Sequence, residues 1–203
     1  MTRFAAISLG ALLYGAIALG ANPVAAADLS AEDLTTLKEM RSGDMSKLVF
    51  HKAARDRVAE SFRDQYGNEI TLADYEGKVV VLNFWATWCP PCRAEMPSID
   101  RLAGEVAGDD IAVLALSTDR HDVQKVVDFF SDTGVENLKV LQDRRGAVAR
   151  EAGVLGLPVT VILDREGREL ARMQGDAEWD SASAKRIVRL IAEATADQQR
   201  ASR

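Results

Sequence analysis

The sequence predicts an α/β fold in which one central sheet carries helices on both faces. Apolar runs of strand length at 79–85, 111–116 and 159–163 alternate with segments at 99–106, 123–130 and 187–194, where apolar residues recur at helical spacing. Strands that alternate with helices in this way need a sheet covered on both sides. A length of 203 residues fits one such domain with extensions.

Composition narrows the class of partner. Hydrophobic residues make up 47% of the chain and charged residues 28%, which is typical of a globular domain with an ordinary polar surface. The net charge is −6, and the chain has no long basic run. Both features argue against nucleic acid as a partner.

The first 27 residues have a different character from the rest. Arg3 is their only charged residue, and residues 4–21 are almost continuously apolar. That stretch reaches the lower limit of a membrane span, and the alanines that end at Ala27 match a signal-peptidase site. A signal peptide cleaved near Ala27 and an anchor formed by residues 4–21 both remain open. Either one exports the remaining chain to the periplasm or cell envelope. A buried helix of a cytosolic protein is the third alternative.

The rest of the chain divides into an extension, a domain and a tail. A capping box that begins at Ser30 predicts a short helix ending near Gly43. Residues 28–60 are expected to form a helical or tether extension, in which His51 is solvated. Residues 61–198 form the predicted domain, and residues 199–203 form a C-terminal tail. Within the domain we expect hairpin turns at 64–68 and 164–167, a strand at 138–141 and a short helix at 146–152.

A pair of cysteines lies where the first apolar strand meets the next helix. The segment 88–92 reads Trp-Cys-Pro-Pro-Cys, and Pro90 suits the first turn of a helix. Cys89 then lies at the helix N-terminus, where free N–H groups and the helix dipole favour the thiolate. Cys92 follows on the same helical face, so a disulfide can close. We predict a redox dithiol in which Cys89, on the exposed side, is the nucleophile and the more buried Cys92 resolves the mixed disulfide.

Two other interpretations of the cysteines are weaker. A structural zinc site needs about four ligands, and the chain offers two cysteines and two histidines, His51 and His121, without metal-binding spacing. We therefore expect no metal and no cofactor. An inert disulfide is also disfavoured, because so short a loop restrains the unfolded chain very little. Prolines at both intervening positions remove N–H donors that could stabilise a thiolate, which argues against a strong oxidant.

The motifs resemble the thioredoxin superfamily. Segment 79–97 resembles its active-site segment, most closely in the TlpA/ResA/CcmG branch, and segment 155–164 resembles its cis-proline loop. Segment 175–179 is similar to TlpA proteins, which are the nearest branch members. The resemblance implies a thioredoxin-like three-layer fold with a mixed central sheet, an N-terminal hairpin and a central strand–helix insertion.

The same resemblance assigns roles to residues around the dithiol. Trp88 flanks it, and Pro158, expected in the cis form, faces it while Leu157 offers backbone groups to the substrate. Glu95 matches an acidic residue that exchanges protons with the dithiol. The alternatives are shielding and packing for Trp88 and a solvated helix charge for Glu95. For Pro158 the alternative is a tight turn packed for stability, which is compatible with the substrate role. At Asn83 the chain departs from thioredoxin, which carries a buried aspartate there.

The resemblance implies an envelope thiol–disulfide oxidoreductase, most simply a reductase of client cysteines. TlpA-like proteins point to copper-centre assembly of cytochrome oxidase, and CcmG-like proteins point to cytochrome c maturation. The electron donor implied is a membrane thiol transporter of the DsbD/CcdA kind. Alternatives are a Sco-type copper chaperone, which would need three residues between its cysteines, and a general disulfide isomerase or oxidase. A thiol peroxidase would need a Pro-Thr context that the motif lacks.

Overall fold

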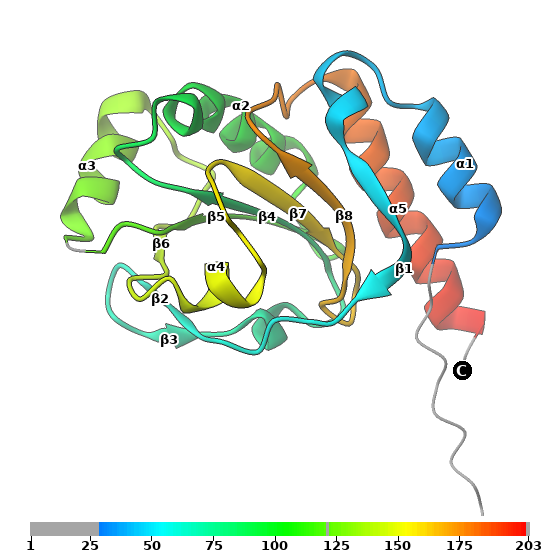
Figure 1. Cartoon of the computed structure of the whole chain (residues 1–203), viewed down its shortest axis with the longest axis horizontal. Coiled ribbons are helices and arrows are strands. Elements are labelled where there is room, and N and C mark those ends of the chain that lie inside the picture. The colour runs from blue at the N-terminus through cyan, green and yellow to red at the C-terminus, as the bar shows by residue number, and fades with distance from the viewer. Residues whose placement is uncertain (1–28, 121, 202–203) are drawn as a thin grey trace, which may run out of the picture.

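The centre of the structure is an eight-stranded mixed sheet (Figure 1). A computed structural model describes residues 29–120 and 122–201. The strand order is β1-β8-β7-β4-β5-β6-β2-β3. Strands β4, β5 and β6 run parallel to one another, and all the remaining neighbouring pairs are antiparallel. The strands are β1 (Val49–Arg55), β2 (Phe62–Asp64), β3 (Glu69–Ile70), β4 (Val79–Trp85), β5 (Ile111–Ser117), β6 (Leu141–Gln142), β7 (Val159–Leu163) and β8 (Glu169–Gln174).

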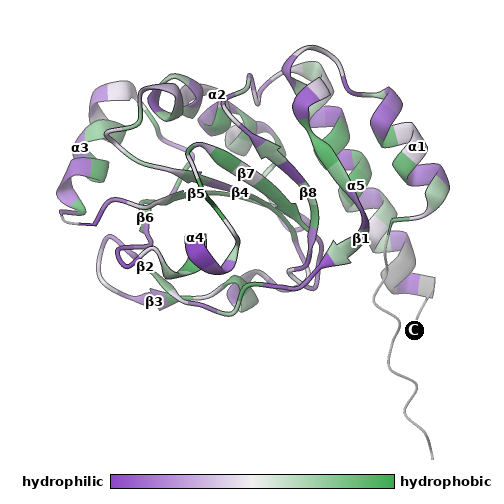
Figure 2. Ribbon diagram, in the orientation of Figure 1, coloured by the Kyte–Doolittle hydropathy of each residue, from purple (hydrophilic) through white to green (hydrophobic). Residues whose placement is uncertain are grey.

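Helices cover both faces of the sheet, as the sequence predicts. The larger apolar core joins one face to α1, α2, α3 and α5, while a second core joins the other face to α4, η2 and the hairpin β2–β3. Figure 2 shows the hydrophobic strands enclosed between these layers. The helices are α1 (Ala31–Glu39), η1 (Gly43–Lys47), η2 (Leu72–Tyr75), α2 (Pro90–Val106), α3 (Gln124–Thr133), α4 (Ala147–Glu151) and α5 (Ala182–Ala201).

Strand β4 is buried along its whole length, and its residues alternate between the two cores. Val81 and Trp85 belong to the core under α2, whereas Leu82 and Phe84 belong to the core on the other face. Side chains in a strand point to opposite faces in turn. Asn83 therefore points to the α2 side, where the only polar residue of β4 meets the helix that carries the cysteines.

The segment 28–60, predicted as an extension, contributes a strand to the central sheet. Residues 49–55 form β1, which pairs antiparallel with β8 and extends the sheet. Phe50 is the one buried residue of β1, so the strand has no alternation of apolar and polar residues. For this reason the sequence does not predict a strand there. The predicted solvated state of His51 is wrong: its Nε2 lies 2.6 Å from the Glu169 Oε1.

Most other predicted elements are confirmed with small shifts. The capping box at Ser30 is present, and both predicted hairpins form. The strand expected at 138–141 is reduced to β6, because its first residues do not pair with a neighbouring strand. Helix α5 continues to Ala201, past the predicted domain end. The predicted leader 1–27 lies outside the described residues, and no helix within the described ranges is long and apolar enough to cross a membrane.

Candidate active site

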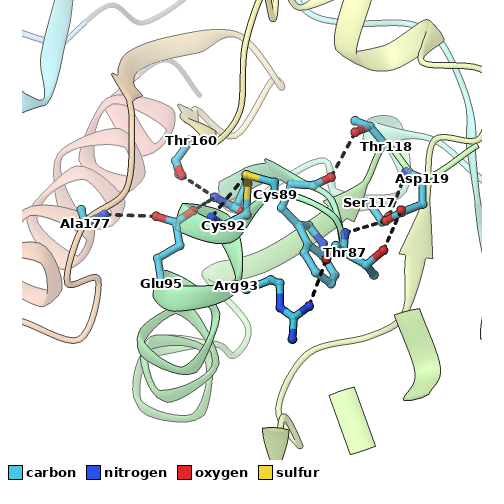
Figure 3. The surroundings of a disulfide bond; sticks show 12 residues. Thr87, Cys89, Cys92, Arg93, Glu95, Ser117, Thr118, Asp119, Thr160 and Ala177 are labelled. Carbon is cyan, nitrogen blue, oxygen red and sulfur yellow. Dashed lines mark hydrogen bonds between the residues drawn. A yellow bond between two sulfur atoms is a disulfide. The ribbon is translucent and has the colours of Figure 1, made fainter. Parts of the chain in front are cut away.

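The two cysteines form a disulfide at the start of α2 (Figure 3). Cys89 is the N-cap residue and Pro90 and Pro91 open the helix, where their missing N–H groups remove no helical bond. The Cα atoms of Cys89 and Cys92 are 5.3 Å apart, and the Cys92 N–H donates to the Cys89 Sγ at 3.3 Å. Cys89 is 4% exposed and Cys92 0%. Cys89 is thus the outer cysteine, but in this oxidised form it is largely covered, because it packs in the core that contains Trp85.

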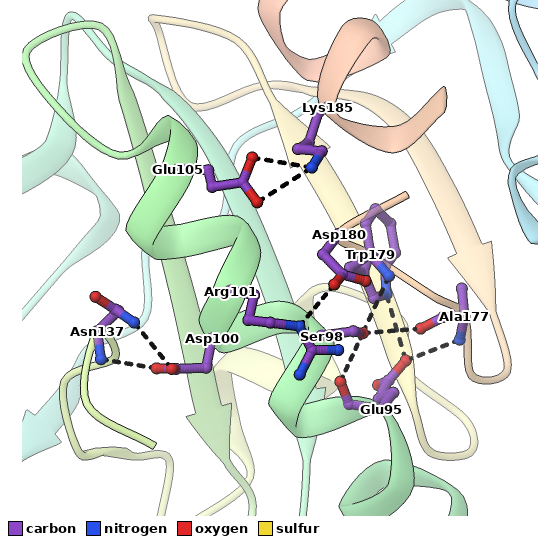
Figure 4. A network of polar contacts seen from close by, with 10 residues as sticks. All are labelled: Glu95, Ser98, Asp100, Arg101, Glu105, Asn137, Ala177, Trp179, Asp180 and Lys185. Carbon is purple, nitrogen blue, oxygen red and sulfur yellow. Dashed lines mark hydrogen bonds and ion pairs between the residues drawn. The ribbon is translucent and has the colours of Figure 1, made fainter. Parts of the chain in front are cut away.

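Glu95 lies one turn after Cys92 and is buried, with 3% of its surface exposed. Its Oε1 accepts a hydrogen bond from the Asn83 Nδ2 at 2.8 Å. Its Oε2 accepts from the Ala177 N–H at 3.1 Å and from the Trp179 Nε1 at 3.3 Å. Figure 4 shows Ala177 and Trp179 reaching the carboxylate from the loop before α5. This burial contradicts the alternative in which Glu95 is a solvated helix charge.

The environment of Glu95 shifts its protonation equilibrium. Burial is the largest cause and raises the pKa of Glu95 to about 7, because the charged form loses its hydration. The donors from Asn83, Ala177 and Trp179 favour the charged form and limit the rise, while the charge of Asp176 adds to it. Glu95 can therefore take up or release a proton near neutral pH, one helical turn from a cysteine.

Asn83 connects the carboxylate to the loop with the cis proline. Its Nδ2 donates to the Thr160 Oγ1 at 2.9 Å as well as to Glu95. Asn83 and Thr160 are opposite partners in the β4–β7 ladder, so both project to the same face. Two residues before Thr160, the Leu157–Pro158 peptide bond is cis, Pro158 is buried and Leu157 is half-buried.

A second buried carboxylate lies on the other side of the disulfide. Asp119 is 6% exposed, and its Oδ2 accepts from the Thr87 N–H at 2.9 Å and from the Ser117 hydroxyl at 2.7 Å. Its Oδ1 accepts from the Thr87 hydroxyl at 2.8 Å. Asp119 thus fixes the chain just before Trp88, which is 68% exposed. Trp88 therefore lies at the surface, and both of its predicted roles, shielding of the dithiol and recognition, stay predictions.

The sequence does not predict most of the polar contacts around the disulfide. Thr160 and Trp179 lie within segments that resemble the family, and no motif marks Asp119. Strand alternation along β4 is the signal that places Asn83 opposite α2. For Asp119 the signal is its position two residues after β5, at the carboxyl end of a parallel strand, where sites of α/β proteins gather.

Metal ligation has no support among the residues that the structure describes. In that part of the chain, no group of three or more histidine, cysteine, aspartate or glutamate side chains is placed to hold a metal ion. The cysteine sulfurs are bonded to each other, and His51 contacts Glu169 in the β1–β8 pair instead.

Comparison with known proteins identifies the family. The model of the AhpC/TSA family matches residues 51–168, and the chain belongs to this family. It is 42% identical to the thioredoxin-like protein YneN of Bacillus subtilis over 53% of this chain. The matched part spans 62% of the length of YneN. It is 31% identical to the thiol–disulfide oxidoreductase ResA of Bacillus thuringiensis over 70% of this chain and 79% of ResA.

A solved structure agrees with these sequence relatives. The exposed lipoprotein thioredoxin Etrx1 of Streptococcus pneumoniae superposes with a TM-score of 0.54 at 29% identity, covering 66% of this chain and 97% of Etrx1. The predicted thioredoxin-like fold and the resemblance to the TlpA/ResA/CcmG branch are therefore confirmed.

Proposed function

We propose that this protein is a thiol–disulfide oxidoreductase of the cell envelope that reduces disulfides in client proteins. The observation that carries the proposal is the Cys89–Cys92 pair at the start of α2, with a titratable carboxylate buried one turn behind it. The similarity to ResA supports the same chemistry.

In the first step, the reduced protein attacks its client through Cys89. The Cys89 thiolate forms a bond to one sulfur of the client disulfide, and the other client sulfur leaves as a thiolate. The position of Cys89 at the N-cap of α2 favours this thiolate through the helix dipole. The product of the step is a mixed disulfide between Cys89 and the client.

In the second step, Cys92 resolves the mixed disulfide. The Cys92 thiol loses its proton and attacks the Cys89 sulfur, which forms the intramolecular disulfide and releases the second client thiolate. Two electrons have then passed to the client. Glu95 takes up the Cys92 proton in this proposal, since its pKa of about 7 suits proton exchange near neutral pH.

The client would lie against residues that flank the disulfide. Trp88 offers an exposed aromatic surface, and the loop at Leu157 and Pro158 offers backbone groups for strand-like pairing. The proposed clients carry paired cysteines, as in factors for cytochrome oxidase copper-centre assembly or in apocytochrome c. A membrane thiol transporter of the DsbD/CcdA kind would return electrons to the dithiol. Both assignments derive from the family resemblance.

Measuring the reduction potential tests the direction of electron flow. Prolines at both positions between the cysteines remove thiolate-stabilising donors, so we expect a value of about −270 mV, at the thioredoxin end of the range. Equilibration in dithiothreitol or glutathione buffers with quantification of the dithiol gives this value. A potential of about −120 mV would identify an oxidant and contradict the reductase function.

Trapping of the client tests the roles of the two cysteines. Cys92→Ser should hold the client on Cys89, because the resolving thiol is gone. Cys89→Ser serves as the matched control and should trap little, because Cys92 is 0% exposed. Trapped proteins should carry cysteine pairs that bind copper or attach haem. A broad set of secreted proteins with structural disulfides would instead indicate an isomerase or oxidase.

A further inference from the structure

Exposed cations gather on one side of the disulfide, in a protein whose net charge is −6. We call this surface the basic rim and define it as Arg93, Arg120, Lys125, Arg144 and Arg145, all of which are exposed. The rim lies on the α3 and β6 side of the disulfide. On this side Asp119 accepts the hydrogen bond from the Thr87 N–H.

The rim is continuous and reaches the cysteines. Arg93 follows Cys92 directly, and its guanidinium carbon lies 5.2 Å from the centre of the Phe129 ring, so its charge is held over α3. Arg120 and Lys125 line a pocket of about 260 Å³ together with Trp88.

A second pocket continues the rim away from the disulfide. Arg144 and Arg145 line this pocket, which has a volume of about 410 Å³. The Arg144 Nε donates to the Arg120 carbonyl at 3.0 Å and so joins the two pockets. The rim therefore forms one surface that begins at the active site.

Two of the acidic residues that line these pockets are buried and bound to neighbouring donors. Asp119 is buried against Thr87 and Ser117. Asp143 is also buried, and its carboxylate accepts the N–H groups of Ala147 and Ala149 at 2.8 and 2.9 Å.

Three exposed acids lie along the rim, fewer than its five cations. Glu69 pairs with Arg63 at 3.2 Å. Asp122 lines the pocket of Arg120 and Lys125 and accepts from the Gln124 N–H at 2.9 Å, and Asp128 accepts from the Gln124 Nε2 at 2.8 Å. Among the described residues, Arg120 and Lys125 form no side-chain ion pair, so their charges are available to a partner.

We propose that the basic rim selects clients that carry acidic residues next to their cysteine pair. This inference rests on the proposed oxidoreductase function and specifies its substrate class. A client whose disulfide reaches Cys89 while its acidic flank lies along the rim gains favourable electrostatic attraction. Such attraction raises the rate of encounter more than the final affinity and weakens with salt. A protein client fits better than a membrane surface, because the rim begins at the reactive disulfide.

Three synthetic peptides test the proposal on the full protein in its reduced form. Each carries the same intramolecular disulfide, flanked by three Glu, three Gln or three Lys residues. The measured quantity is the second-order rate constant at which each peptide oxidises the protein dithiol, followed by tryptophan fluorescence. At low salt the Glu peptide should react about three to ten times faster than the Lys peptide. This ratio should approach one in about 0.5 M salt, because screening then acts within a few ångströms.

A charge-reversed variant and a matched control assign the effect to the rim. Arg120→Glu combined with Lys125→Glu should invert the ratio between the Glu and Lys peptides. The control, Lys38→Glu combined with Lys52→Glu, makes the same change in net charge on exposed residues of α1 and β1, far from α3 (Figure 1). It should keep the ratio in favour of the Glu peptide.

The outcomes separate this inference from the function on which it rests. Equal rates for the three peptides, or a preference that survives charge reversal, would overturn the rim assignment while the oxidoreductase function stands. No reduction of any peptide would overturn the proposed function itself. Equal peptide rates together with rim-dependent binding to phosphatidylglycerol vesicles would replace the protein client by a membrane surface.

Discussion

Two buried carboxylates flank the same disulfide, yet the structure gives them different surroundings. Glu95 lies inside the helix that carries both cysteines and receives three N–H donors, from Asn83, Ala177 and Trp179. Asp119 lies in the loop after β5 and receives one N–H and two hydroxyl groups, from Thr87 and Ser117. Figure 3 shows the two acids on either side of the sulfur atoms.

The comparison teaches that burial alone does not assign a role to a carboxylate. The partners of Asp119 belong to the chain segment that leads into Trp88 and Cys89, so Asp119 holds that segment in place. Glu95 is fixed by donors behind the helix and lies on the same side of α2 as the buried Cys92. We therefore assign proton exchange to Glu95 and positioning of the active-site loop to Asp119.

The largest expected effect concerns the stability of Glu95→Gln as a function of pH. The folded-state pKa of Glu95 is raised from 4.5 to about 7, so between these values the folded protein holds a proton that the unfolded chain has released. The wild-type free energy of unfolding should therefore fall, relative to the variant, as pH rises through this window. Because each pKa unit corresponds to about 1.4 kcal/mol, this fall in the free energy of unfolding amounts to about 3 kcal/mol. Urea unfolding of both oxidised proteins at pH 4 and pH 8 measures it, and parallel pH profiles would contradict the assignment.

Asp119→Ala should produce the next largest effect, which is a loss of stability at every pH. The change leaves the Thr87 N–H and the hydroxyls of Thr87 and Ser117 without their acceptor, and it should lower the free energy of unfolding by about 2 kcal/mol. Asp128→Ala is the control, since Asp128 is exposed on α3 and should have almost no effect. A loss at Asp119 that changes between acid and neutral pH would contradict this positioning role.

A smaller effect is expected on the reactivity of the thiols. In the reduced protein, a charged Glu95 disfavours a thiolate at the nearby cysteines. Glu95→Gln should therefore move the pH profile of iodoacetamide alkylation to lower pH by up to about one unit. Asp119→Asn should leave the profile in place. Identical profiles for wild type and Glu95→Gln from about pH 5 to pH 10 would remove Glu95 from the proton path.

The smallest effect tests Trp179 as a positioning residue for Glu95. Its indole N–H favours the charged carboxylate, so Trp179→Phe should raise the pKa of Glu95 further. The midpoint of the Glu95-dependent change in stability should move upward accordingly. The double variant with Glu95→Gln should show no such shift, which separates this effect from lost packing. A shift that persists in the double variant would show that Trp179 acts through another group.

The sequence predicts the core of this fold well, and its edges less well. Strand β4 and helices α2 and α5 follow from strong apolar patterns, because they are packed against the largest core. Strand β1 gives no such pattern. It is held mainly by backbone pairing to β8, and Val49 is 59% exposed, so its sequence carries little information about its pairing.

The candidate site shows the same division. The cysteine pair and the cis Pro158 are encoded in short local motifs, so sequence alone locates them. The donors to Glu95 come from β4 and from the loop before α5, and 82 residues separate Glu95 from Ala177 in the chain. Contacts between segments so far apart depend on the completed fold, and local spacing cannot predict them.

The pairing of β1 with β8 also bears on solubility. Without residues 49–55, β8 would become the edge of the sheet and would present unpaired N–H and C=O groups along a mostly buried strand. Such an edge is a template for association with other chains. As the outer strand, β1 instead carries exposed Lys52 and Arg55, and its register is interrupted between Phe50 and Arg55. A fragment that starts at residue 61 would therefore keep the disulfide site and be prone to aggregation.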